Sequence, residues 1–462
     1  MENKQFRPFG WRDKVGYLLG DFGNDFTFIM ASSYLMKFYT DVMGVSAGVV
    51  GVIMMLARIV DAFTDIVMGR IADRSPVTAN GKFKPWLKRM CIPVAFAGFL
   101  MYQAGFADWA MNAKIAYLAV TYLLWGSFCY TGINIPYGSM ASAISADPSD
   151  RQSLSTFRTM GGMLAGMIIM IGVPLIAYTE DALGNSVMVG ERITVAAGVF
   201  SVLAVICYLL CYKLVTERVV VENAAEEQPG LREMISGAMG NRALISIIAA
   251  AILMLLSQLT MQGMANYVYP NYYGDPTAQS ASSALMAVGM IAAAVMAKPL
   301  GAKFGKAEVS AVCCAFATIM NILLFFVRPE SVWVYAGFQM LSWLGLGVFQ
   351  MVCWALITDV IDDTEVRTGR REDGTVYAIY SWARKLGQAA SSGLMGWLLT
   401  LIGYTDATAF DPVVTKGIFD ISVIVPVIGF GALALVLVFW YPLHKKAVDA
   451  NVAYLNAKHG RT

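Results

Sequence analysis

Apolar runs of about 20 residues or more recur along almost the whole chain of 462 residues, and short charged segments separate them. A bilayer core of about 30 Å is crossed by a helix of about 20 residues, so each run is long enough to span it. The pattern predicts an all-α membrane protein of twelve transmembrane helices. The expected spans are residues 15–40, 46–71, 87–107, 113–143, 155–178, 193–215, 243–268, 278–302, 308–328, 331–360, 376–402 and 417–441.

Composition excludes several other classes of protein. Apolar residues make up 57% of the chain and charged residues only 14%, whereas a soluble domain has about 25% charged residues. The net charge is +2 and no basic block is present, which argues against nucleic-acid binding. The two histidines, His444 and His459, lie in the polar C-terminal tail, so His-based catalysis and the usual zinc sites are not expected. We expect neither an enzyme nor a cofactor.

The distribution of positive charge predicts the orientation in the bilayer. With the N-terminus in the cytoplasm, 24 of the 34 Lys and Arg residues fall on cytoplasmic segments and four on outer loops. Cytoplasmic loops of membrane proteins are enriched in Lys and Arg in this way. We therefore expect an integral protein of a bacterial cytoplasmic membrane, surrounded by lipid, with both termini in the cytoplasm.

The longest polar interruption divides the chain into two sets of six spans. We expect a cytoplasmic tail (1–14), a six-helix bundle (15–215), a cytoplasmic linker (216–242), a second six-helix bundle (243–441) and a C-terminal tail (442–462). Two such halves are typical of a transporter whose site lies near the middle of the membrane. The chain has no GxxxxGK[ST] motif, so ATP is not expected to supply the energy. We expect the monomer to be the functional unit.

Three charged residues lie on one stripe of the second span. Arg58, Asp61 and Asp65 are spaced i, i+3 and i+7, so Asp61 and Asp65 are close enough to share one small cation. Charges at membrane depth are costly and mark sites by default. A proton, Na⁺ or Li⁺ would neutralise the pair, and Thr64 and Thr131 could add hydroxyl oxygens. The alternative is a salt bridge from Arg58 that only locks helices together.

A second polar set lies on spans 1, 4, 5 and 11. The amide of Asn134 and the phenol of Tyr130 suit a sugar, because each sugar hydroxyl group both donates and accepts hydrogen bonds. For Asp21 the alternative is a loop cap, and Lys385 would bind either an anionic substrate or the aspartate cluster. We expect the neighbouring Arg384 to extend towards the cytoplasmic side. The candidate substrate-binding residues are Asp25, Asn24, Tyr130, Asn134, Arg158 and Lys385.

Two cytoplasmic loops are rich in paired charge, namely GRIADRSPVTANGKFKPW and DVIDDTEVRTGRREDG. They are either solvated turns or ion pairs that hold the cytoplasmic side closed in one state, and we favour the second interpretation. The residues expected in this cytoplasmic latch are Asp73, Arg74, Asp359, Asp362, Arg370 and Arg371.

Several of these segments carry a family resemblance. MGRIADR with GKFKPW resembles the loop 2–3 motif of the major facilitator superfamily. The stretch from YLMKFYTDVMG to MGRIADR, together with NIPYGSMASAISADPSDRQSLSTFR and TDVIDDTEVRTGRREDGTVYAIYSWARKLG, resembles the glycoside–pentoside–hexuronide:cation symporters, to which melibiose permease belongs. The resemblance covers about residues 12–440. It implies the twelve-helix facilitator fold and uptake of a sugar derivative driven by Na⁺, Li⁺ or H⁺.

The resemblance also implies roles for individual residues. The two cation-binding aspartates of the family match Asp61 and Asp65, and its hydroxyl ligand matches Thr131, whereas its amide ligand is replaced by Thr64. The sugar-binding aspartate, tyrosine and arginine match Asp25, Tyr130 and Arg158, and the lysine of span 11 matches Lys385. Asn24, Asn134 and Gly138 replace a lysine, an aspartate and a tryptophan, so an α-galactoside of the melibiose type is not expected.

We therefore expect a symporter that couples a monovalent cation to uptake of a glycoside, pentoside or hexuronide by alternating access. One alternative keeps the fold and changes the cargo to a lysolipid or another amphiphile carried with sodium. A membrane sensor is a further alternative, but the cytoplasmic segments are too short to hold a signalling domain.

Overall fold

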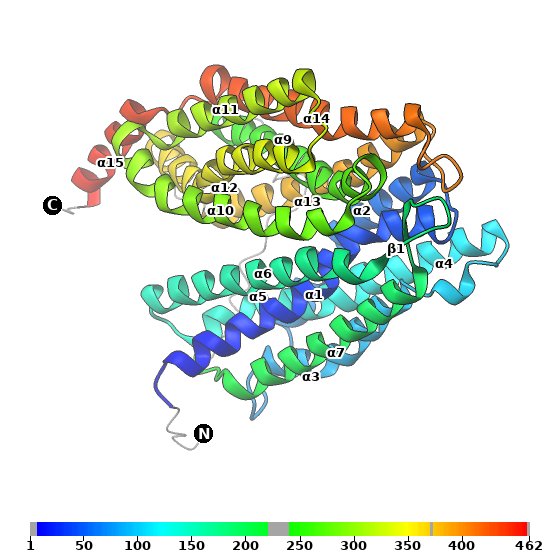
Figure 1. The fold of residues 1–462 in the computed structure, drawn as a ribbon. Helices are drawn as coiled ribbons and strands as arrows, with labels where there is room; N and C mark the ends of the chain where they lie inside the picture. Colours follow the sequence, from blue (N-terminus) through cyan, green and yellow to red (C-terminus); the bar gives the residue numbers. More distant parts are fainter. Residues whose placement is uncertain (1–6, 220–239, 370–372, 460–462) are drawn as a thin grey trace. The chain divides into compact units, whose positions relative to one another are not determined.

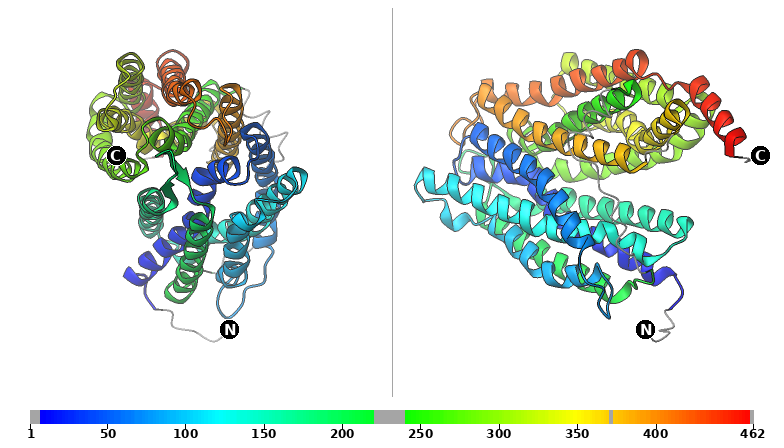
Figure 2. Two further views of the ribbon diagram at one scale, coloured as in Figure 1. Left: turned by 45° about the vertical axis from the view of Figure 1, so that its right-hand side comes forward. Right: turned by 180° about the vertical axis from the view of Figure 1, so that it is seen from behind.

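The computed structural model describes residues 7–219, 240–369 and 373–459, and it is built almost entirely of helices (Figure 1). The chain forms two compact units. The first contains Met1–Ala225 together with Met395–Phe410, and the second contains Glu226–Leu394 together with Asp411–Thr462. Figure 2 shows from two further sides that the helices of each unit run side by side.

The first unit is a bundle in which α1 packs against α6 and α7, and α2 against α4 and α5. Between α6 and α7 the chain forms a short antiparallel hairpin of β1 and β2. The fourth span is continuous from Met111 to Ile144, and its central part is a π-helical segment, η2. The elements are α1 (Trp11–Asp41), α2 (Ala47–Asp73), α3 (Lys84–Leu100), η1 (Ala104–Phe106), α4 (Met111–Leu123), η2 (Leu124–Tyr130), α5 (Thr131–Ile144), α6 (Pro148–Ala177), β1 (Tyr178–Glu180), β2 (Ser186–Met188) and α7 (Gly190–Leu214).

In the second unit, α12 packs against α10 and α11, and α14 against α9 and α11. The last turns of α13 and the loop after it, Met395–Phe410, cluster with the first unit instead. The elements are α9 (Arg242–Tyr267), η3 (Val268–Tyr272), α10 (Pro276–Phe304), α11 (Lys306–Val327), α12 (Val332–Thr368), α13 (Asp373–Leu401), α14 (Pro412–Leu435), η4 (Val436–Trp440) and α15 (Lys445–His459).

The expected spans coincide with helices or with continuous runs of helical segments, except that 87–107 extends beyond α3, which ends at Leu100 and is separated from η1 by a turn. Within the described ranges, nine helices are long and apolar enough to cross a membrane, and α1, α3 and α13 fall short of that criterion. The α1 helix carries several charges along its length, α3 has only 17 residues, and α13 contains the charged pair Arg384–Lys385.

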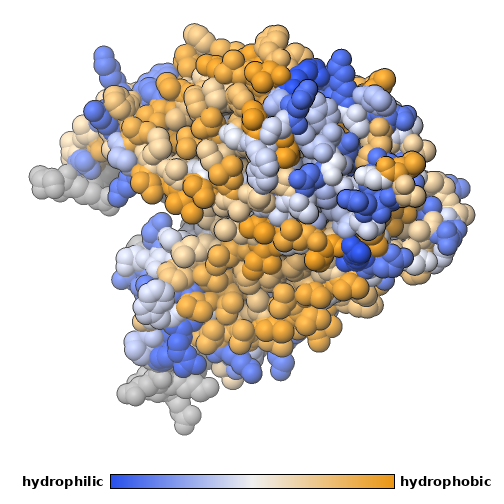
Figure 3. Space-filling view, in the orientation of Figure 1, coloured by the Kyte–Doolittle hydropathy of each residue, from blue (hydrophilic) through white to orange (hydrophobic). Residues whose placement is uncertain are grey.

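Large apolar side chains lie on the outside of the helices, as a lipid environment requires. On α7, Val195, Val199, Val202 and Ile206 repeat at intervals of three or four residues and are between 47% and 64% exposed. Apolar residues of this kind cover much of the face shown in Figure 3. The expected integral membrane protein is supported by these outward apolar stripes, because a soluble protein rarely exposes contiguous apolar patches of this extent.

Candidate functional site

Two carboxylates of α2 each accept a hydrogen bond from a hydroxyl group of the fourth span. Ser127 Oγ donates to Asp61 Oδ1 at 2.5 Å, and Thr131 Oγ1 donates to Asp65 Oδ1 at 2.8 Å. Both pairs join residues 66 positions apart, because the i, i+4 spacing of the carboxylates on α2 matches that of the hydroxyl groups. The structure thus brings together three of the four residues expected at the cation site and adds Ser127. We call Asp61, Asp65, Ser127 and Thr131 the carboxylate–hydroxyl cluster.

The π-helical segment η2 presents this cluster to α2. Gly126, within η2, lies directly against Asp61, and a Cβ atom at this position would be 3.0 Å from Asp61 Oδ2. The Thr131 hydroxyl, which donates to Asp65, also lies 3.1 Å from the carbonyl oxygen of Gly126 as a second hydrogen-bond acceptor. π-Helical turns in long helices occur frequently at functional sites. The absence of a side chain at Gly126 therefore leaves space beside a buried carboxylate.

The remaining polar groups of α2 differ from the expectation in detail. Arg58 Nη1 lies 3.8 Å from Asp61 Oδ2, so the internal ion pair that we weighed as the alternative is present in the structure. The Arg58 guanidinium also lies over the Phe28 ring, 4.8 Å from its centroid. The Thr64 hydroxyl donates to the backbone carbonyl of Asp61 at 3.2 Å, rather than to a carboxylate.

A second group of polar residues lies between α1 and α6. Arg158 Nε donates to Asp21 Oδ1 at 3.0 Å, and the guanidinium lies over the Tyr137 ring, 5.3 Å from its centroid. The Tyr137 ring stacks in turn on Tyr17, with 4.6 Å between the centroids. Asp21, for which a loop cap was one interpretation, therefore lies inside α1 and holds the guanidinium of an expected substrate-binding residue.

Asp25 lies one turn along α1 from Asp21, and both carboxylates face the backbone of α6 at Gly162. A Cβ atom at Gly162 would overlap Asp25 Oδ2 and lie 3.2 Å from Asp21 Oδ2. Among the described residues, the Asp25 carboxylate has no hydrogen bond or ion pair, although it lies in the field of Arg158 and Asp21. Gly162 is thus the residue that allows two carboxylates and one guanidinium to share this space. We call Asp21, Asp25 and Arg158 the carboxylate–arginine group.

The other expected substrate-binding residues of the first unit surround this group. Asn24 is buried, donates from Nδ2 to Asn134 Oδ1 at 3.4 Å and accepts from the Tyr208 hydroxyl at 2.8 Å. Tyr130 stacks on Phe28, with 5.7 Å between the ring centroids. The amide of Asn24 is therefore held by protein partners, whereas Asp25 beside it is not.

Lys385 belongs to α13 in the second unit, where it is half-buried. Its neighbour Arg384 lies over two aromatic rings, 5.5 Å from the centroid of Trp354 and 5.8 Å from that of Tyr380. Arg384 was expected to extend towards the cytoplasm, and these stacked rings explain how its charge is accommodated within the unit.

The residues of the expected cytoplasmic latch are described in part. Asp73 and Arg74 are exposed at the end of α2, and neither forms an ion pair within the ranges that the structure describes. Asp359 is buried and pairs with Lys306 of the same unit at 2.5 Å. Asp362 lies in the last two turns of α12, where the neighbouring Asp363 pairs with Arg367. Arg370 and Arg371 lie outside the described residues.

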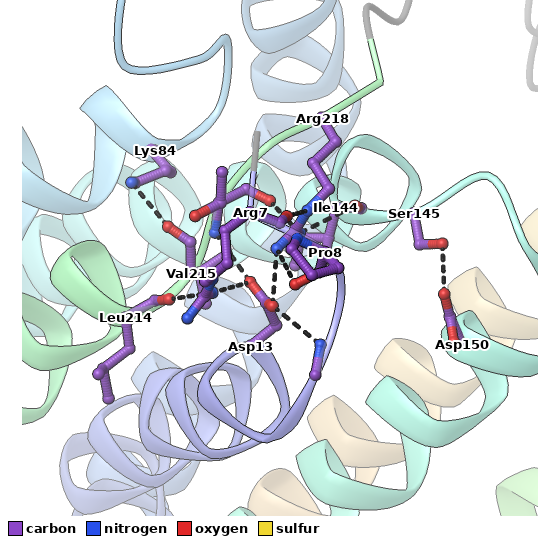
Figure 4. A network of polar contacts seen from close by, with 12 residues as sticks. Arg7, Pro8, Asp13, Lys84, Ile144, Ser145, Asp150, Leu214, Val215 and Arg218 are labelled. Atoms are coloured by element: carbon purple, nitrogen blue, oxygen red, sulfur yellow. Dashed lines mark hydrogen bonds and ion pairs between the residues drawn. The ribbon is translucent and has the colours of Figure 1, made fainter. Parts of the chain in front are cut away.

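A network at one end of the first unit was not anticipated from the sequence (Figure 4). Asp13 is fully buried and pairs with Arg7 and Arg218, each at 2.8 Å, while the Thr216 N–H donates to it at 3.0 Å. Arg218 also donates to the carbonyl oxygen of Ile144. The segment that follows α7 is thereby fastened to the start of α1 and to the end of α5.

Glu217, which lies between Thr216 and Arg218 in the same segment, binds the backbone at the start of α3. Its carboxylate accepts the backbone N–H groups of Lys82, Phe83 and Lys84 at 2.6, 3.0 and 2.6 Å. Gly81 precedes them with φ of 108°, and a Cβ atom there would lie 2.5 Å from the carboxylate carbon. Burial raises the pKa of Glu217, and the three N–H donors partly offset that rise. The GKFKPW motif is therefore bound through its backbone by one carboxylate.

Comparison with known proteins identifies the kind of molecule in which this site occurs. The family model described as MFS/sugar transport protein matches residues 16–445. The chain is 32% identical over 440 residues to the glucuronide carrier protein homolog of Escherichia coli (strain K12), and the alignment covers 94% of this chain and 93% of that relative. It is 27% identical over 454 residues to the putative sulfoquinovose importer of the same organism, and that alignment covers 97% of this chain and 94% of the relative.

Solved structures show the same fold at low sequence identity. The crystal structure of the nucleoside transporter NupG matches with a TM-score of 0.61 and 14% identity, covering 91% of this chain and 98% of that one. The crystal structure of the D-xylose-proton symporter matches with a TM-score of 0.61 and 13% identity, covering 93% of this chain and 97% of that one.

Proposed function

The chain belongs to the MFS/sugar transport protein family, and from that premise we propose that it is a symporter in which a monovalent cation, Na⁺, Li⁺ or H⁺, drives uptake of a glycoside, pentoside or hexuronide. Family membership confirms the predicted resemblance, the helical membrane fold and transport of a sugar-type substrate, rather than catalysis, as the activity. The coupling ion and the particular substrate are the parts that we propose.

The observation that carries the proposal is the carboxylate–hydroxyl cluster. Asp61 is buried, with only 5% of its surface exposed, and its carboxylate and that of Asp65 lie one helical turn apart. Small hard cations prefer oxygen ligands, and a hydroxyl group that donates to a carboxylate can turn its lone pairs to a cation instead. Arg58 supplies one positive charge to Asp61, and a coupling cation between Asp61 and Asp65 would place a further positive charge against both carboxylates.

The polar residues between α1, α5 and α6 support a sugar-type substrate. Asp25 offers a carboxylate that accepts hydrogen bonds from hydroxyl groups, and Asn134 and Tyr130 offer groups that donate and accept. Arg158 suits a carboxylate or sulfonate, because its planar guanidinium can donate two parallel hydrogen bonds. Two relatives, the glucuronide carrier homolog and the putative sulfoquinovose importer, are named for substrates of that acidic kind.

Coupling requires each ligand to strengthen binding of the other. Tyr130 immediately precedes Thr131 in sequence, so one segment reaches both the proposed sugar site and the carboxylate–hydroxyl cluster. A cation that orders this segment would raise the affinity for sugar, and linkage makes the effect reciprocal. We further propose that the charged cytoplasmic loops around Asp73, Arg74, Asp359 and Asp362 stabilise one state of the alternating cycle.

Uptake by proteoliposomes containing the purified protein tests the proposal. Labelled methyl β-D-glucuronide, methyl β-D-xyloside and methyl α-D-galactoside would be supplied separately, with the Na⁺ gradient and the pH gradient varied independently. We expect accumulation of the glucuronide or the xyloside above the external concentration, and its loss when an ionophore dissipates the coupling gradient. Equilibration that never exceeds the external concentration under any gradient would contradict symport.

A further inference from the structure

The carboxylate–arginine group carries an inference about how a negatively charged sugar is bound, which rests on the function proposed above. Arg158 is held by Asp21 at 3.0 Å, yet 37% of its side chain remains exposed. Part of the Arg158 side chain is therefore accessible to a ligand while its guanidinium is bound to the protein's own carboxylate. Asp21 holds the Nε side of the guanidinium, which a sugar carboxylate or sulfonate would need in order to accept two parallel hydrogen bonds from Nε and Nη.

The carboxylate–arginine group has too few positive charges to neutralise an anionic ligand as well as its own two carboxylates. Within the first unit the group holds two carboxylates and one guanidinium, a net charge of −1 when all three are ionised. The other titratable groups that face it are Tyr17 on α1, Tyr130 on η2, Tyr137 on α5, and Tyr208 and Cys211 on α7. Phenols and thiols are ordinarily neutral near pH 7, so they add no charge.

An anion entering this group would raise the imbalance to −2, and a low-dielectric site does not favour three negative charges around one guanidinium. The two carboxylates lie together against Gly162, so an added anion would place a further negative charge close to both. The added negative charge is compensated most simply if Asp21, the carboxylate that loses its ion-pair partner, becomes protonated. A protonated carboxyl group can also donate a hydrogen bond, which the ionised form cannot.

We propose that a sugar acid binds by exchange with Asp21: its carboxylate or sulfonate replaces Asp21 on Arg158, and Asp21 takes up one proton from water as it is released. One ion pair breaks and one forms, and the proton taken up cancels the added negative charge. Asp25 keeps the protonation state that it has in the free protein and forms hydrogen bonds with the hydroxyl groups of the sugar. A neutral glycoside leaves the Asp21–Arg158 pair intact and binds without proton uptake.

Calorimetric titration of the purified protein in detergent tests the exchange. Methyl β-D-glucuronide and methyl β-D-glucoside differ in charge but share their shape, and each would be titrated at about pH 8 in two buffers of different ionisation enthalpy. We expect uptake of about one proton with the glucuronide and none with the glucoside. The affinity for the glucuronide should rise by up to about tenfold for each unit of decreasing pH.

The Asp21→Asn variant provides the second arm. Asparagine resembles the protonated carboxyl group, so the variant should bind the glucuronide about tenfold more tightly than the wild type at about pH 8, with no proton uptake. Asp108→Asn, which changes an exposed carboxylate of the same unit in the loop before α4, should leave proton uptake unchanged. Glucuronide binding by the wild type without proton uptake, or proton uptake that persists in Asp21→Asn, would overturn the proposal.

This test is separable from the test of symport. If proteoliposomes exchange labelled glycoside for unlabelled glycoside but the glucuronide neither binds nor exchanges, the inference about Asp21 fails and the proposed function stands. If no sugar is exchanged at all, the proposed function fails and the inference fails with it. The wild-type titration needs no variant, so it decides the matter even if Asp21→Asn does not fold.

Discussion

The hydroxyl group of Ser127 donates to the buried carboxylate of Asp61 at 2.5 Å, across the contact between η2 and α2. Thr131 makes the equivalent bond to Asp65 one turn further along both elements, at 2.8 Å. Two carboxylates on one helix are therefore matched by two hydroxyl groups on its neighbour. This correspondence makes the cluster a defined site rather than a loose gathering of charge.

The Ser127 hydroxyl should contribute to cation affinity. In Ser127→Ala the cation-bound site loses one hydroxyl oxygen, so we expect the cation concentration for half-maximal uptake to rise about tenfold or more. Ser142→Ala is a matched control, because the Ser142 hydroxyl donates only to the carbonyl of Ser139, within α5. Equal half-maximal concentrations in the two variants would show that Ser127 plays no part.

A buried lysine at the far end of α1 should make Asp41 important for stability. Lys37 is 1% exposed, and its Nζ lies 2.7 Å from Asp41 Oδ2 and 2.8 Å from the Tyr404 hydroxyl. Removing the carboxylate leaves a buried ammonium without its ion-pair partner, so Asp41→Asn should lower the free energy of unfolding by about 3 kcal/mol.

Thermal unfolding in detergent, followed by the reactivity of buried cysteines, measures this effect. The double variant Lys37→Met/Asp41→Asn removes both charges and should recover most of the lost stability. A double variant as unstable as Asp41→Asn would mean that packing around Asp41, and not charge, is the cause.

The raised pKa of Glu217 predicts how stability changes with pH. Because burial places the pKa of the folded state above that of the unfolded chain, the folded protein binds more protons between the two values. Stability from this group is therefore fully present at low pH and declines as pH rises through the folded pKa. Glu217→Gln lacks the titration, so its unfolding temperature relative to the wild type should increase from about pH 5 to about pH 8. A difference that is constant with pH would contradict the assignment.

Much of the helical layout was predictable, because apolar length alone limits where helices can cross a bilayer. The i, i+4 spacing of Asp61 and Asp65 predicted a shared site, and the structure brings Thr131 to it. Ser127 was missed although it lies four residues before Thr131, the same spacing as the two carboxylates. That repeat was a usable signal, but its meaning depends on which face of the fourth span meets α2.

Other contacts depend on how distant segments fold back, and local patterns do not encode them. Asp21 and Arg158 are 137 positions apart, and only the packing of α1 against α6 shows that they are partners. Glu217 looked like part of a polar linker, yet it accepts three backbone N–H groups from the loop before α3. Tyr404 likewise reaches Lys37 only because Met395–Phe410 clusters with the first unit.

The central claim, that Asp61 and Asp65 bind the coupling cation, is tested most directly by cation-dependent sugar uptake in proteoliposomes containing Asp65→Asn or Asp61→Asn. Asp108→Asn serves as the control, because Asp108 is an exposed carboxylate of the same unit in the loop before α4. We predict that uptake by both site variants loses its stimulation by Na⁺, Li⁺ or a proton gradient, while the control keeps the wild-type response. Undiminished stimulation in either site variant would contradict the account.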